Sequence, residues 1–365
     1  MKRIFLMFSF VAILLIAVSC SDNGAYIEEG GGNGNPSDIS PVAGLYILNS
    51  GKMGSNNANL LYWDCTSAQA SANVFESANG KKLGDTGNSM IIYGKRIYIA
   101  VTGSSIVFVT DLKGNLIKEL TVEGESANLS PRQLLGAGGK VYVSYMEGYV
   151  GAIDTASFSV GKVKVGPMPE GMAYANKKIY VANSDGYNYE GGYGKTLSVI
   201  DEATFTVTKT LEVANNPQTL HAVSENKVYL VCWGDYGNIP AKLQKINTVN
   251  DTVTDVPEVQ PTNMATGKDG IAYILSTVYD ENWNATAQYS IFDTVKDKLA
   301  GEFVPSADIP NGYSIFADKI TGDVYIGTSD YISNGDVYIL SSDGEIRTKF
   351  DTGGLNPIAI CTVEK

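Results

Sequence analysis

Short apolar strands centred on a tyrosine recur along the chain at intervals of 38 to 52 residues. Apolar residues flank each tyrosine on either side, which is the pattern of a β-strand that is covered on both faces. The copies are GLYILN at Tyr46, RIYIAV at Tyr98, KVYVSY at Tyr142, KIYVAN at Tyr180, KVYLVC at Tyr229, IAYILS at Tyr273 and DVYIGT at Tyr325. We expect these seven equivalent tyrosines to pack between repeated units and not to form a site.

Each copy has companion strands at regular places. A proline-led apolar strand lies upstream, as in PQTLHAV from Pro217, and a strand that usually ends in Asp or Asn lies downstream, as in LSVID ending at Asp201. A strand rich in valine and threonine then closes the unit, as in FTVTKTLEV from Phe205 to Val213. Four short strands with frequent turns, repeated in this way, predict the blade of a β-propeller.

The two ends of the chain complement each other. The last unit ends near Phe350, yet the chain continues with NPIAICTVEK, whereas the first unit starts at GLYILN and lacks a proline-led strand. Pairing these segments would complete blade one and leave no sheet edge open. The sequence therefore predicts an all-β, seven-bladed β-propeller over residues 41–365, with blade one closed by the N- and C-terminal strands together.

The N-terminal segment has the pattern of a lipoprotein signal. Lys2 and Arg3 precede an apolar run that is too short to span a bilayer, and AVSC places Cys20 where a bacterial lipoprotein is acylated. We therefore predict a signal peptide at 1–19 and an acylated Cys20. Residues 20–40 are rich in glycine and acidic residues, which predicts a flexible tether to a membrane.

Charge and cysteine content narrow the possible partners. The formal net charge is −12, and it becomes −14 without residues 1–19, which argues against nucleic acid and against an anionic lipid surface as partners. Besides Cys20, the chain has Cys65, Cys232 and Cys361, which allow at most one disulfide and do not have the spacing of a metal site. We expect each of the three to be a small buried residue in a strand.

Connections on one face of the predicted propeller carry most of the candidate chemistry. In a four-stranded meander, the connections between the second and third strands and those between blades emerge on this face, and the former are long at 49–59, 184–195, 233–242, 278–288 and 329–336. Their large aromatic residues are Tyr187, Tyr189, Tyr193, Trp233, Tyr236, Tyr279, Trp283 and Tyr331. The residues after the repeated proline are expected at the mouth of the channel, namely Arg132, Glu170, Gln218, Thr262 and Asn311.

Aromatic side chains surrounded by amides suit a large, flat ligand that is both apolar and hydrogen-bonding. We therefore predict ligand binding by the eight aromatic residues together with Arg132, Gln218 and Asn311. A purely structural role for these rings, in which they pack the long loops onto the scaffold, is the alternative.

The sequence gives little support for catalysis, and we expect no enzyme. His221 is the one histidine, and its place in a proline-led strand favours a buried imidazole. A single histidine excludes a multi-histidine metal site and disfavours a Ser-His-Asp triad, so no metal ligands are predicted. Carboxylates are plentiful, and an acid/base pair among them stays open.

KIYVANSDG, LSVIDEATFTVTKTLEV and the proline-led strands resemble the YVTN-type propellers of the YncE family over residues 41–365. Together with the lipobox, the tether and the tyrosine-rich rim, the chain resembles the BtuG-like surface lipoproteins of gut Bacteroidetes. That resemblance implies a lipid-anchored protein on the outer membrane that captures cobalamin or another corrinoid. It also implies delivery of this ligand to a TonB-dependent, BtuB-like transporter, with no covalent cofactor. No single rim residue matches a family motif.

Two other classes of function stay open at this point. Aromatic rims also stack on sugars, so a glycan-binding or adhesive surface propeller is one alternative. A propeller lyase or lactonase that uses rim carboxylates is the other, because related propellers serve many chemistries.

Overall fold

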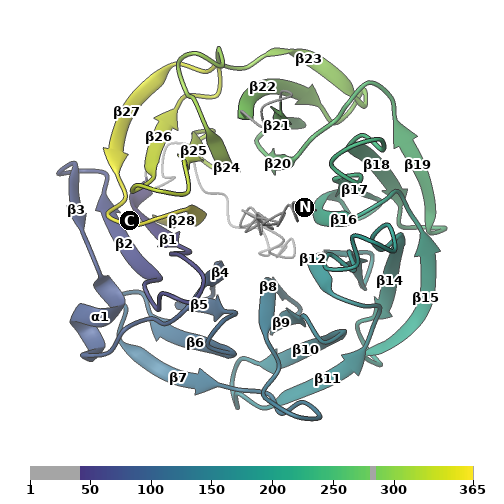
Figure 1. The fold of residues 1–365 in the computed structure, drawn as a ribbon, viewed down its shortest axis with the longest axis horizontal. Helices are drawn as coiled ribbons and strands as arrows, with labels where there is room; N and C mark the ends of the chain where they lie inside the picture. Colours follow the sequence, from purple (N-terminus) through teal and green to yellow (C-terminus); the bar gives the residue numbers. More distant parts are fainter. Residues whose placement is uncertain (1–41, 280–284, 365) are drawn as a thin grey trace, which may run out of the picture.

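The computed structural model describes residues 42–279 and 285–364. Within these ranges, 28 strands form seven antiparallel sheets of four strands each. The sheets stand as blades around a central axis, and successive blades follow one another round the ring (Figure 1). The predicted all-β, seven-bladed propeller is confirmed.

Blade 1 is built from both ends of the chain. Its innermost strand is β28 (Pro357–Glu364), which pairs antiparallel with β1 (Val42–Asn49) so that Ile360 lies opposite Ile47. The blade continues outward through β2 (Asn59–Asp64) and β3 (Gln69–Ser71). The predicted closure is confirmed, and it removes the open sheet edges that the first and last units would otherwise expose.

The other six blades each use four consecutive strands, running from the axis outward. Blades 2 to 4 comprise β4 (Gly87–Tyr93), β5 (Arg96–Val101), β6 (Ile106–Asp111) and β7 (Leu116–Leu120); β8 (Pro131–Ala137), β9 (Lys140–Tyr145), β10 (Tyr149–Asp154) and β11 (Val160–Lys164); and β12 (Pro169–Ala175), β13 (Lys178–Asn183), β14 (Thr196–Asp201) and β15 (Thr206–Glu212).

Blades 5 to 7 comprise β16 (Pro217–Ser224), β17 (Lys227–Cys232), β18 (Lys242–Asn247) and β19 (Thr252–Val256); β20 (Asn263–Thr266), β21 (Ile271–Tyr279), β22 (Ala285–Asp293) and β23 (Lys298–Glu302); and β24 (Gly312–Ala317), β25 (Val324–Thr328), β26 (Asp336–Leu340) and β27 (Ile346–Asp351).

One short helix, α1 (Val74–Asn79), lies between blades 1 and 2 and was not predicted. It contacts β2 and β7 at the outer rim (Figure 1). Phe75 is buried, and its ring centroid lies 4.8 Å from that of Phe108. The helix ends at Gly80, which has the left-handed conformation common at helix C-termini.

The repeated tyrosines lie in the second strands, between neighbouring blades. At Tyr46, Tyr98, Tyr142, Tyr180, Tyr229, Tyr273 and Tyr325 the exposed fraction is at most 3%. The apolar core is correspondingly divided into clusters that join strands of adjacent blades. The expected packing role of these residues agrees with their positions.

None of the three cysteines among the described residues is in a disulfide. Cys232 and Cys361 are buried in strands, as expected. Cys65 is different, because it is exposed in the turn that follows β2, so the expectation of a buried strand residue is wrong there. In the same part of the chain, no helix is long and apolar enough to cross a membrane, and no group of acidic, histidine and cysteine side chains is placed to hold a metal ion.

Candidate functional site

We call the face that carries the connections between second and third strands the loop face, and the opposite one the turn face. Blade 6 extends further on the loop face than its neighbours. Its strands β21 and β22 have nine residues each, whereas β17 and β18 of blade 5 have six. The pairing of β17 with β18 ends at Cys232 opposite Lys242, but β21 and β22 continue for three more pairs beyond Ser276 and Gln288. Much of the predicted loop 278–288 is therefore a projecting hairpin, which corrects that prediction.

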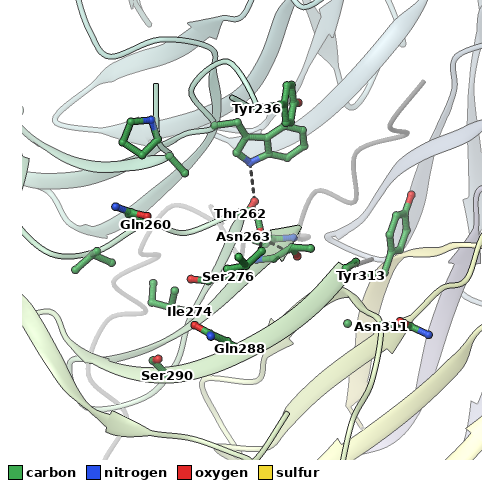
Figure 2. A pocket seen from close by; sticks show the side chains of 18 of the residues that line it. Tyr236, Gln260, Thr262, Asn263, Ile274, Ser276, Gln288, Ser290, Asn311 and Tyr313 are labelled. Atoms are coloured by element: carbon green, nitrogen blue, oxygen red, sulfur yellow. Dashed lines mark hydrogen bonds between the residues drawn. The ribbon is translucent and has the colours of Figure 1, made fainter. Parts of the chain in front are cut away.

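A cavity of about 510 Å³ lies beside this hairpin on the loop face. Its lining comes from the loop between the second and third strands of blade 5, the connection between blades 5 and 6, and the strands of blade 6. Blade 7 contributes the segment that leads into β24 and the loop between β25 and β26. Figure 2 shows Gln260, Thr262, Ser276 and Gln288 across its floor, with Asn311 and Tyr313 to one side. The site is thus shared by three consecutive blades.

Two aromatic residues of blade 5 form one wall. The Trp233 side chain is only 8% exposed, and its indole Nε1–H donates to the Thr262 carbonyl at 2.7 Å (Figure 2). Tyr236 stands edge-on to Trp233, with ring centroids 6.1 Å apart, and edge-on to Tyr193 at 5.9 Å. Trp233 is therefore a core residue that exposes one edge to the cavity, whereas Tyr236 presents much more of its ring.

Blade 7 supplies the opposite wall. Tyr313 and Tyr331 line the cavity and meet edge-on at 5.8 Å. Burial, with a smaller contribution from nearby Tyr331, raises the pKa of Tyr313 well above its ordinary value, so its hydroxyl stays protonated. Asn311 precedes β24 and also lines the cavity.

The strand surface at the floor of the cavity is more exposed than the equivalent strand surface of the other blades. Ser290 pairs with Ile274 and is half-buried. The residues at the equivalent position of the other six blades are all buried: Leu61, Phe108, Gly151, Ser198, Gln244 and Tyr338. Blade 6 thus presents a polar strand surface where the other blades are covered.

The described residues that line the cavity carry almost no charge. Among its described lining residues, Glu258 is the one acid, and there is no lysine, arginine or histidine. The side-chain amides of Gln260, Gln288 and Asn311 have no hydrogen-bond partner in the part of the chain that the structure describes. Such a surface suits an uncharged ligand that both donates and accepts hydrogen bonds, and it offers nothing to neutralise an anion.

Three of the other predicted aromatic residues, Tyr187, Tyr189 and Tyr193, do not line the cavity. Tyr187 and Tyr189 are 54% and 61% exposed, and Tyr193 reaches the site only through its contact with Tyr236. Tyr279 is the last residue of β21. Trp283 and Cys20 lie outside the described residues, as do the predicted signal peptide and tether.

Arg132 and Gln218 are buried near the axis. The Arg132 guanidinium donates from Nε and Nη2 to the two Glu170 carboxylate oxygens, at 3.0 and 2.9 Å, and from Nη1 to the Asn88 Oδ1 atom at 3.0 Å. Gln218 donates to the side-chain oxygen of Asn216. Neither residue lines the cavity, and the ligand-binding role predicted for them stays a prediction.

Three lining residues that matter for the site were missed: Tyr313, Gln260 and Gln288. In blades 3, 4 and 5 the inner strand begins at the repeated proline, but β24 begins at Gly312, two residues after Pro310. The inner-strand position that holds Arg132 and Gln218 elsewhere is therefore occupied by Tyr313 in blade 7. The sequence feature that marks this shift is the pair of residues between Pro310 and Tyr313 in PNGYSIF.

A family model described as a domain of unknown function, DUF5074, matches residues 43–312. The chain belongs to the DUF5074 family. The match begins in β1 of blade 1 and ends at the start of β24, so this DUF5074 region contains most of the lining of the cavity.

Solved structures resemble this DUF5074 chain in fold. A quinonprotein alcohol dehydrogenase-like protein from Bacteroides thetaiotaomicron has 16% identity and a TM-score of 0.63, covering 90% of this chain and 79% of that one. Hydrazine synthase from Kuenenia stuttgartiensis has 14% identity and a TM-score of 0.58, covering 76% and 95%. Streptogramin B lyase has 12% identity and a TM-score of 0.51, covering 72% and 82%.

At these identities the comparisons establish only the propeller architecture of the DUF5074 chain, because one fold hosts many functions. No curated protein matches the sequence.

Proposed function

We propose that this protein binds cobalamin or a related corrinoid on its loop face, with part of the ligand inside the cavity between blades 5 and 7. The observation that carries the proposal is the described lining, in which Glu258 is the one charged residue and aromatic walls surround three amides without a partner among the described residues. A corrinoid has apolar ring faces and a rim of amides, which can pair with Gln260, Gln288 and Asn311 without any basic side chain.

The size of the cavity limits how much of the ligand enters. A volume of 510 Å³ lies within the range of about 300–1,000 Å³ typical of pockets for drug-sized molecules. A corrinoid is larger than such molecules, so the rest of it would lie over the surrounding loop face. Tyr187 and Tyr189 offer exposed rings on the loop beside Tyr236.

Binding without catalysis fits the same residues. Among the described lining residues, Glu258 has no second acid and no histidine or lysine with which to form an acid/base pair. His221 is buried away from the lining, and burial lowers its pKa to about 3. We therefore propose a carrier and not an enzyme, anchored through Cys20 to the outer membrane and passing its ligand to a TonB-dependent transporter, as the sequence resemblance implies.

Mixing the purified propeller with cyanocobalamin and passing it through a desalting column tests the proposal directly. We expect the protein fraction to be red, and a colourless fraction at micromolar protein would rule the proposal out. The double variant Gln260→Ala, Gln288→Ala should weaken capture by about tenfold or more, because two hydrogen bonds are lost. Its melting temperature should match that of Gln69→Ala, an exposed glutamine on β3 that serves as the control.

A glycan is the second candidate ligand. The observation that favours it is the same set of tyrosine rings with amide and hydroxyl groups, in a cavity open to the surface. Retention on a soluble polysaccharide, together with a colourless fraction in the cyanocobalamin experiment, would favour this function instead.

A further inference from the structure

Three loop tyrosines have a left-handed backbone. The φ angles of Tyr193, Tyr236 and Tyr331 are 62°, 60° and 61°. All three lie on the loop face, in the connections between second and third strands of blades 4, 5 and 7. A bulky residue in this conformation is strained, and such strain persists only where the surrounding structure holds it.

Tyr236 and Tyr331 are held in the same way. Each follows an aspartate whose Oδ1 atom accepts two backbone N–H groups from beyond the tyrosine. Asp235 accepts from Gly237 at 2.9 Å and Ile239 at 2.7 Å. Asp330 accepts from Ile332 at 2.8 Å and Ser333 at 2.7 Å. The aspartate closes the turn around the tyrosine and fixes its direction.

Both residues also line the cavity, from the blades on either side of blade 6. Each ring is fixed edge-on against a second aromatic residue of the same wall, Trp233 for Tyr236 and Tyr313 for Tyr331. The rings nevertheless remain 41% and 45% exposed. The two rings are thus oriented by their neighbours and remain accessible.

The reversal of the chain does not by itself require tyrosine. Glycine takes the positive φ angle in the turns of the same class at Gly51 and Gly148, with values of 74° and 85°. Glycine adopts this conformation without steric cost, and asparagine tolerates it well. Aromatic residues also take this backbone outside the cavity lining, as at Phe158 and Phe205, so the combination of this backbone with a place in the lining is what distinguishes Tyr236 and Tyr331.

We propose that Tyr236 and Tyr331 form a preorganised clamp, in which a strained backbone is retained because the two rings grip a flat, uncharged group of the ligand from opposite sides of the cavity. This inference rests on the proposed corrinoid binding. Rigid rings lose little entropy when the ligand enters, so the strain is matched by tighter binding. Tyr193 has the same backbone but does not line the cavity, so it is the control for backbone strain alone.

Paired substitutions separate strain from contact. Alanine and asparagine both remove the ring, but only asparagine tolerates the left-handed backbone. At positions 193, 236 and 331 we expect the asparagine variant to melt about 1–3 °C above the alanine variant, since relief of the strain stabilises the fold. At Tyr189, which does not have a positive φ angle, the two variants should melt together.

Cyanocobalamin capture then identifies the clamp. Tyr236→Ala, Tyr236→Asn, Tyr331→Ala and Tyr331→Asn should each weaken capture at least tenfold, whereas Gln69→Ala, on the exposed strand β3, should leave it unchanged. Tyr236→Phe and Tyr331→Phe keep the rings and should retain capture. Unchanged capture in the alanine variants at 236 and 331, with wild-type protein still red, would overturn the clamp and leave corrinoid binding intact. Colourless wild-type protein would overturn both the clamp and corrinoid binding. Equal melting temperatures of the alanine and asparagine variants at each position would show that the backbone there is not strained.

Discussion

The repeated tyrosines of the second strands and the tyrosines of the loops occupy opposite environments in this molecule. The seven repeated tyrosines are at most 3% exposed, whereas the loop residues Tyr187, Tyr189, Tyr236 and Tyr331 are 41% to 61% exposed. The strand rings fill the space between blades. The loop rings project from one face, and two of them border the cavity.

The strand tyrosines in blades 4 and 5 also make polar bonds across the blade boundary. The Tyr180 hydroxyl donates to the Asp251 carboxylate at 2.7 Å, and Lys178 reaches the same carboxylate at 2.9 Å. Tyr229 and Lys227 repeat this arrangement with Asp297 of blade 6. Each aspartate lies in a turn of the following blade, on the turn face.

Position within the repeat, and not residue type, therefore decides what a tyrosine does here. In a strand, burial and a carboxylate partner raise the pKa of Tyr180, so its hydroxyl remains a protonated donor that joins two blades. In a loop, the same side chain is available to a ligand. Stability and binding can therefore be tested separately.

Removing a strand ring should have the largest effect on stability. Tyr229 is fully buried and packs edge-on against Phe292, with ring centroids 5.4 Å apart. We expect Tyr229→Ala to lower the free energy of unfolding by about 3–5 kcal/mol, because it leaves a cavity between blades 5 and 6. Urea denaturation followed by circular dichroism measures the change.

Tyr189→Ala is the matched control, because the Tyr189 ring is 61% exposed. Its effect on the free energy of unfolding should stay within about 0.5 kcal/mol. If both variants lost the same stability, the loop tyrosines would belong to the scaffold, and the contrast between the two sets would disappear.

A pH titration extends the comparison to ionisable groups. Burial, and to a smaller degree Lys319, lowers the pKa of His221 to about 3. Since histidine in the unfolded chain has a pKa near 6.5, the unfolded state binds more protons between these values. The contribution of neutral His221 to the free energy of unfolding should be fully present above pH 6.5. Below this pH the free energy of unfolding should fall by about 1.4 kcal/mol per pH unit. Hydrogen bonds from Ser333 lower the pKa of Asp330 to about 2, so the loop carrying Tyr331 keeps its anchor over this range.

His221→Gln provides the comparison for this measurement. Burial raises the pKa of Glu170, against the opposing effect of Arg132, and this contributes a pH dependence of the opposite sign. Because Glu170 is present in both proteins, the difference between their urea midpoints from pH 6.5 to pH 4.5 isolates the histidine. Parallel curves for the two proteins would contradict a buried neutral imidazole at position 221.

The fold was largely predictable because each blade carries the same local signals. A tyrosine-centred strand, a leading proline and an Asp-terminated strand recur, and the unmatched ends indicated the closure of blade 1. Helix α1 was missed because it occurs once and outside the repeat. The blade 6 hairpin was read as a loop because its alternating polar residues, as in ATAQYS, resemble those of a connection.

The candidate site was less predictable, because it depends on side-chain directions and on contacts between blades. The aromatic content of the loops indicated the face on which the cavity lies. Sequence spacing could not show that Trp233 is buried against blade 6 or that Arg132 is paired with Glu170. Nor could it show that two additional residues after Pro310 would bring Tyr313 to the cavity.

Removing only the hydroxyl group tests the smallest part of the comparison. Tyr180→Phe deletes a donor to the Asp251 carboxylate and should cost about 1.5 kcal/mol, as expected for a hydrogen bond to a charged group. Tyr98→Phe is matched in burial and strand position, but within the described residues the Tyr98 hydroxyl is buried without a partner. Its loss should be neutral or slightly stabilising, because an unsatisfied polar group leaves the core. Equal losses in the two variants, measured by urea denaturation, would mean that packing of the ring and not the inter-blade hydrogen bond distinguishes these strands.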